Sequence, residues 1–139
     1  MSEIHEGKGM ITNIVRFRLS VALVALLVFT GLASANPSNK WRLQFSGDAK
    51  SDGVIVLRFS PVGGDPLTVP ISIAAGTSEN HVAKVVVETL RAKLPSDGFH
   101  IERDDGEDVL IKKRKKAASF DLEVVSNSVR HVRINPDRE

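Results

Sequence analysis

The sequence predicts an α+β domain in which a mainly antiparallel sheet of six to seven short strands packs on one amphipathic helix. Three observations predict it: an apolar stripe with helical spacing at residues 77–94, several short segments in which apolar and polar residues alternate, and tight-turn residues between them. The expected order is three strands, the helix, then three or four strands. Short strands joined by tight turns favour antiparallel pairing, with the helix covering one side of the sheet.

The predicted helix, residues 77–94, is defined by its period. At 100° per residue its apolar side chains fall within one arc, which overrides the strand preference of its β-branched residues. The arc consists of Val82, Ala83, Val86, Val87, Leu90 and Leu94. Thr77 and Ser78 are candidate N-caps, and Pro95 prevents the helix from continuing. Because both ends are marked, a helix is favoured over the alternative of a buried strand.

Three strands are predicted before the helix, at residues 41–45, 54–59 and 67–73. The first alternates strictly between apolar and polar residues, and the second is a continuous apolar run of the kind found in central strands. In the third, Pro70 lacks a backbone N–H. That strand is therefore expected to lie at a sheet edge or to contain a bulge.

Residues 99–113, after the helix, have the pattern of a β-hairpin. A three-residue loop at residues 105–107 places the apolar residues of both strands on one face, whereas a two-residue loop at residues 105–106 would divide them between faces. Burial favours the three-residue loop.

The remaining residues predict two further strands. Residues 119–124 alternate without interruption, and residues 129–134 form a short last strand with Val132 and Ile134 facing inward. Residues 135–139 are expected to be a polar tail.

Residues 1–35 have the pattern of a secretory signal peptide that is cleaved after Ala35. Arg16 and Arg18 precede an apolar run at residues 21–33, which ends in the Ala-Ser-Ala sequence that a signal peptidase accepts. The expected product is exported to the periplasm or the cell exterior.

A retained membrane anchor is the alternative, because the 17 uncharged residues 19–35 are just enough to span a bilayer. Met10 is an alternative start that would leave the compact positive head typical of signal peptides. In either case residues 36–139 form one domain, and they contain no apolar run long enough to span a membrane.

Composition limits the function of this domain. Residues 1–35 contain three of the 19 basic and two of the 17 acidic residues, which leaves residues 36–139 with a formal net charge of +1. A nearly neutral domain has little global attraction to polyanions. The chain has no cysteine, which excludes disulfides and thiolate metal sites.

One basic run stands out: Lys112, Lys113, Arg114, Lys115 and Lys116. Such a run can contact an anionic polymer or surface. It can also act as a solvated strand end that discourages aggregation. No aromatic residue interleaves the run for base stacking, and acidic residues lie nearby in the sequence, so the solvated strand end is favoured and the anionic contact is the alternative.

The acidic residues Asp104, Asp105, Glu107 and Asp108 lack the alternating spacing of a helix-loop-helix calcium site. They indicate a plain turn instead.

No catalytic, metal-binding or cofactor-binding residue is predicted. His81, His100 and His131 are not spaced as metal ligands, and the glycines at residues 63–64 precede a strand rather than a phosphate-binding helix. The sequence contains no nucleophile elbow and no HExxH helix. We therefore expect no enzyme activity and no cofactor.

The alternating strand, the Gly-Thr step, the Ala-Val-rich helix and the Asp-Gly hairpin together resemble the small modules of flagellar hook-associated and phage tail proteins. The matching positions are Val69, Ile71, Gly76, Thr77, Val82, Ala83, Leu90, Asp105, Gly106 and Leu110. This resemblance implies a structural role in assembly or adhesion, without catalytic residues.

These observations predict a small exported, non-catalytic binding or structural module that acts through its surface or an exposed strand edge. Its expected partner is a protein or another component of the cell envelope, or a second copy of the chain. The alternative function is binding of an anionic polymer through the basic run.

Overall fold

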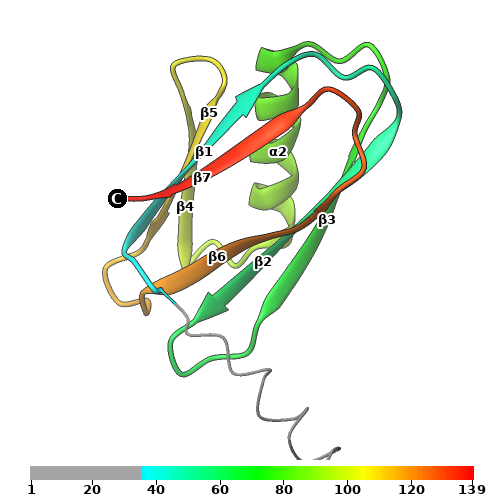
Figure 1. The fold of residues 1–139 in the computed structure, drawn as a ribbon. Coiled ribbons are helices and arrows are strands. Elements are labelled where there is room, and N and C mark those ends of the chain that lie inside the picture. The colour runs from blue at the N-terminus through cyan, green and yellow to red at the C-terminus, as the bar shows by residue number, and fades with distance from the viewer. Residues whose placement is uncertain (1–35) are drawn as a thin grey trace, which may run out of the picture. The chain divides into compact units, whose positions relative to one another are not determined.

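The fold is known from a computed structural model that describes residues 36–139. The expected signal peptide and its cleavage site lie outside the described residues. The elements are β1 (Lys40–Ser46), β2 (Gly53–Pro61), β3 (Leu67–Ile73), α2 (Glu79–Lys93), β4 (Phe99–Asp104), β5 (Asp108–Lys113), β6 (Phe120–Asn127) and β7 (Arg133–Arg138). The predicted α+β class and the predicted order are confirmed (Figure 1).

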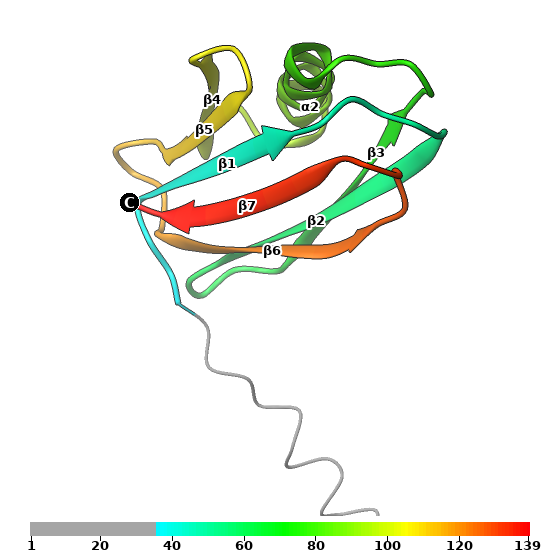
Figure 2. The ribbon, with the colours of Figure 1, turned by 45° about the horizontal axis from the view of Figure 1, so that its top comes forward.

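The strands form two antiparallel sheets, where the sequence predicted one. The first sheet has the order β4-β5-β1-β7 and the second the order β3-β2-β6. The sheets are joined where Ser38 and Phe120 exchange backbone hydrogen bonds of 2.9 and 3.0 Å. In Figure 2, α2 lies between the β4–β5 hairpin and β3, so that it covers one side of both sheets.

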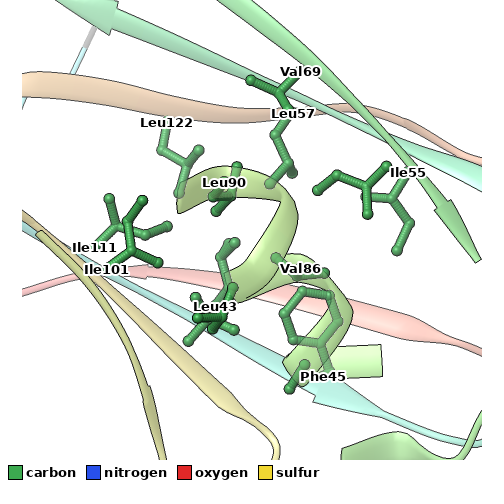
Figure 3. Packing of buried hydrophobic residues seen from close by; sticks show 14 of the residues in the cluster. Leu43, Phe45, Ile55, Leu57, Val69, Val86, Leu90, Ile101, Ile111 and Leu122 are labelled. Carbon is green, nitrogen blue, oxygen red and sulfur yellow. The ribbon is translucent and has the colours of Figure 1, made fainter. Parts of the chain in front are cut away.

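The core lies between α2 and the inner faces of the two sheets. All the residues of the predicted apolar arc are buried, Val86 and Leu90 completely. Figure 3 shows these two side chains between Leu43 and Phe45 of β1 on one side and Leu57 of β2 on the other. Burying a side chain of this size stabilises the fold by about 1.5–3 kcal/mol. α2 is 15 residues long, and no helix within residues 36–139 has the length and hydropathy needed to cross a membrane.

The start of α2 differs from the prediction. Ser78 occupies the N-cap position, but its side chain makes no capping bond, and its Oγ lies 2.8 Å from His81 Nδ1. The first backbone N–H, of Glu79, donates instead to Asp48 Oδ1 at 2.9 Å. The helix cap therefore comes from the loop between β1 and β2, which joins this loop to the helix.

The β4–β5 hairpin has the predicted three-residue loop. Asp104 pairs with Asp108, which leaves residues 105–107 as the loop. Asp105 and Gly106 have φ values of 46° and 78°, in the left-handed region that Asp and Gly tolerate in turns. The predicted register, and with it the plain turn, is confirmed.

The C-terminal strand starts later and ends later than predicted, because residues 129–132, which were expected to begin it, lie in a turn. β7 begins at Arg133 and includes most of residues 135–139, which were expected to be a polar tail. Val132 and Ile134 do face inward, the first buried and the second partly buried against the core. Apart from Ile134, the residues of β7 are polar or proline, so its sequence shows almost no alternation of apolar and polar residues. Backbone pairing with β1 holds the strand in place.

Candidate binding surfaces

The basic run does not form one continuous surface, because strand alternation separates its members. Lys112 lies on the outer face of the four-stranded sheet, where its Nζ is 2.9 Å from Glu102 Oε1. Lys113 lies on the opposite face of the strand. Arg114 and residues 115–116 follow in an exposed turn.

Arg114 takes part in a second group of cationic side chains, near the C-terminal end of α2. A hollow of about 290 Å³ lies there. It is lined by Arg91, Leu94, Ser96, Phe99, His100, Ile101 and Arg114 and is called the cationic hollow below. The turn at residues 95–98 brings the end of α2 and the start of β4 together at this point.

Both guanidinium groups of the cationic hollow are held by backbone carbonyls. Arg91 donates from Nε and Nη2 to the Ile101 carbonyl oxygen at 3.0 and 2.9 Å. Arg114 donates from Nε to the Ser96 carbonyl oxygen at 3.0 Å. These contacts fix two long side chains that would otherwise be mobile.

Glu102 contacts His100, a lining residue of this hollow, and its charge is already shared. Its Oε1 binds Lys112, and its Oε2 lies 3.2 Å from His100 Nε2. Hydrogen bonds from Lys112 first, and then from His100, hold the pKa of Glu102 below its usual range. Among the described residues, neither Arg91 nor Arg114 forms an ion pair.

A second, mainly apolar hollow of about 470 Å³ shares Phe99 with the cationic hollow. It is lined by Pro61, Leu67, Pro95, Asp97, Gly98, Phe99, Lys116, Ala117 and Ala118. Lys116 is its one basic lining residue. The basic run is thus divided among an ion pair, a strand face and two different hollows.

The largest ion-pair cluster lies on the outer face of the four-stranded sheet. Arg42 contacts Asp104 at 3.1 Å, Asp108 at 2.8 Å and Glu139 at 2.6 Å. Glu139 also pairs with Lys40. Lys40 and then Arg42 lower the pKa of Glu139, and Glu139, Asp108 and Asp104 raise the pKa of Arg42. This cluster connects β1, β4, β5 and the last residue of the chain, so its evident role is structural.

The acidic loop and the histidines do not converge. Within residues 36–139 no three His, Cys, Asp or Glu side chains have the geometry of a metal site. His81 contacts Ser78, His100 contacts Glu102, and His131 contacts the Asp48 backbone, so the three histidines lie in separate places.

Both outer edges of the four-stranded sheet carry an obstacle to further strand pairing. At β4, Arg91 occupies the outward Ile101 carbonyl. At β7, Glu139 donates its N–H to the Lys40 carbonyl, so the backbone groups of every second residue from Glu139 point toward β1. Pro136 is one of the residues between them, so it faces outward, and it has no N–H to offer another strand.

The three-stranded sheet has a more open edge at β3. The Ser128 N–H donates to the Val54 carbonyl, so the backbone groups of Val54 and of every second residue along β2 point toward β6. Their partners in β3 are Thr68, Pro70 and Ser72, whose backbone groups therefore face outward. Pro70 therefore lies on an edge strand, as predicted, at a position where no ladder donor is needed. Thr68 and Ser72 keep their outward N–H groups on either side of it.

The sequence marks these sites only in part. Arg114 belongs to the conspicuous basic run, but Arg91 appears only as a basic residue in the last helical turn, and His100 appears as an isolated histidine. The signal that joins them is the short turn at residues 95–98, which holds a helix end beside a strand start. No family model matches this chain, and no curated protein matches it.

Proposed function

We propose that this chain is a small exported, non-catalytic binding module that contacts a protein of the cell envelope, or a second copy of itself, through the outer face of the three-stranded sheet. The observation that carries this proposal is a pair of exposed valines on adjacent strands, called the valine patch below. Val54 of β2 is 37% exposed, and the irregularity in the pairing of β6 with β2 leaves Val125 40% exposed. Exposed apolar side chains on a sheet that also has an open edge strand favour a contact surface.

The contact is expected to be weak. Stable interfaces bury about 1,200–2,000 Å² in total, and two half-exposed valines supply little of that area. Thr68 and Ser72 offer outward hydrogen-bonding groups at the β3 edge, while Pro70 between them lacks a donor. Association should therefore depend on concentration and be easily reversed.

The test is a pair of aspartate variants made in the full chain. V54D combined with V125D should abolish concentration-dependent sedimentation and cross-linking to an envelope protein, because it places charges in the valine patch. V62D is the matched control, since Val62 is 59% exposed but follows β2 in the β2–β3 loop. Circular dichroism confirms that each variant is folded. A protein that stays monomeric and uncross-linked, or equal losses in both variants, would contradict the proposal.

Binding of an anionic polymer through the basic run is the second candidate function. It is supported by the exposure of Arg114, Lys115 and Lys116 in one turn. Replacing all five basic residues with glutamine should remove salt-dependent retention on a sulfonated column, because screening by salt weakens exposed charge contacts. Retention that does not respond to salt, or to the substitutions, would eliminate this function.

Export itself is part of the proposal. The product recovered outside the cytoplasm should begin at Asn36, and intact-mass spectrometry measures this directly. An unprocessed amino terminus on the exported protein would contradict it. The resemblance to flagellar hook-associated and phage tail modules stays a prediction, and a structural role of that kind would also act through surface contacts.

A further inference from the structure

We propose that the cationic hollow is a binding site for a single oxyanion group, a phosphate, sulfate or carboxylate carried by the ligand. This inference rests on the second candidate function and deepens it by adding Arg91 and His100, which lie outside the basic run. Two guanidinium groups, one from α2 and one from the turn after β5, line the same hollow. His100 of β4 also lines it, and its Nε2 lies 3.2 Å from Glu102.

The two guanidinium groups are fixed in place yet retain unused donors. A guanidinium has five N–H donors in a planar fork that matches an oxyanion. Arg91 uses two of them on the Ile101 carbonyl, and Arg114 uses one on the Ser96 carbonyl. Because both side chains are already ordered, a ligand does not have to immobilise them on binding.

The surroundings leave the positive charge available. Glu102 is occupied by Lys112 and His100, and the two arginines have no acidic partner among residues 36–139. The lining side chains of Leu94, Phe99 and Ile101 are apolar and buried, so they offer no side-chain hydrogen-bonding group that would compete for the two arginines.

The size of the hollow limits what it can hold. Pockets for drug-sized ligands have volumes of about 300–1,000 Å³. At about 290 Å³ and open to solvent, the hollow is close to the small end of this range, so it has room for one charged group and a larger ligand would extend outside it.

Titration of the full-length protein with sodium phosphate, sulfate or acetate at constant ionic strength, followed by amide NMR shifts, tests the site. We expect saturable binding with shifts centred on residues 91–101 and 114. The three anions distinguish a tetrahedral from a planar group.

R114Q and K115Q form the matched pair, because they remove the same charge from adjacent residues and only Arg114 lines the hollow. R114Q should raise Kd at least about tenfold, which corresponds to 1.4 kcal/mol. K115Q should change Kd by less than about twofold, since an exposed and screened charge contributes little. R91K keeps the charge without the fork and should also weaken binding.

Equal effects of R114Q and K115Q, or shifts that never saturate, would overturn the proposed site. If the proposed site fails this test but the R114Q variant is still retained on the sulfonated column, polymer binding by the basic run would remain supported. The failure of the two ideas can therefore be distinguished.

Discussion

Gly47 makes the closest backbone approach in the loop that caps the helix. Its φ is +89°, and a Cβ atom built on it would lie 2.2 Å from the His131 carbonyl oxygen. Its N–H donates to Glu79 Oε2 at 2.7 Å, which ties the loop to the start of α2. We therefore predict that G47A destabilises the protein by more than the left-handed backbone alone explains.

Gly63 supplies the reference, because its φ is +73° and nothing lies within 4 Å of a Cβ built there. An alanine in this conformation costs about 1–2 kcal/mol. At Gly47 the displacement of the His131 backbone adds about 1–3 kcal/mol, the cost of overpacking. We expect the free energy of unfolding to fall by about 1–2 kcal/mol in G63A and by about 2–5 kcal/mol in G47A. Both variants also gain a little stability because alanine restricts the unfolded chain more than glycine does, and this gain is the same for the two.

Urea denaturation followed by circular dichroism measures both free energies of unfolding, and thermal melts give a second measure. For a domain of this size, 1 kcal/mol corresponds to a shift in Tm of about 4–8 °C. If G47A and G63A agree within about 0.5 kcal/mol, the steric argument about His131 is refuted, because the backbone conformation alone would then explain both losses.

Two further predictions concern the helix cap and acid stability. D48A should lose about 0.5–2 kcal/mol in urea denaturation because the Glu79 N–H loses its acceptor, whereas S78A should lose less because the Ser78 side chain caps no backbone group. The folded-state pKa values of Glu102 and Glu139 are lowered, so their contribution to stability is present above the ordinary carboxyl range and is lost as the pH falls through their folded pKa values. Tm should therefore fall on acidification from about pH 6, and the Tm of E102Q should fall less steeply than that of the parent protein. Parallel Tm–pH profiles of the two proteins would contradict the assignment to Glu102.

Local sequence patterns were sufficient to predict the structure wherever burial and chain geometry constrain the same residues. The hairpin loop at residues 105–107 was predictable because a change of one residue would have moved one strand's apolar side chains to solvent. Pro70 indicated an edge because it has no N–H to donate. The helix face was predictable from its period.

Long-range choices were not predictable from such patterns. The helix cap joins residues separated by 31 positions, and neither Asp48 nor Glu79 marks the other in the sequence. The division into two sheets depends on which strands β1 pairs with, and alternation says only that a strand exists. The pairing of the C-terminal residues with β1 is held by backbone bonds and by Arg42, so it leaves no apolar signal.

The cationic hollow was missed for the same reason. Arg91 and Arg114 come from different elements, and each is fixed by a carbonyl rather than by a complementary side chain. A sequence pattern shows only which charged residues are neighbours along the chain. This site depends on the turn at residues 95–98, which brings charged residues of different elements together.

The pairing of β1 with β7 has a bearing on biosynthesis. Arg42 binds Glu139, which is 97 positions later in the sequence, so β1 cannot complete its pairing with β7 until those later residues have been synthesised. At about 5–20 residues per second, the ribosome needs roughly 5–20 s to supply them. During that interval the edge of β1 that binds β7 in the folded domain has no partner strand.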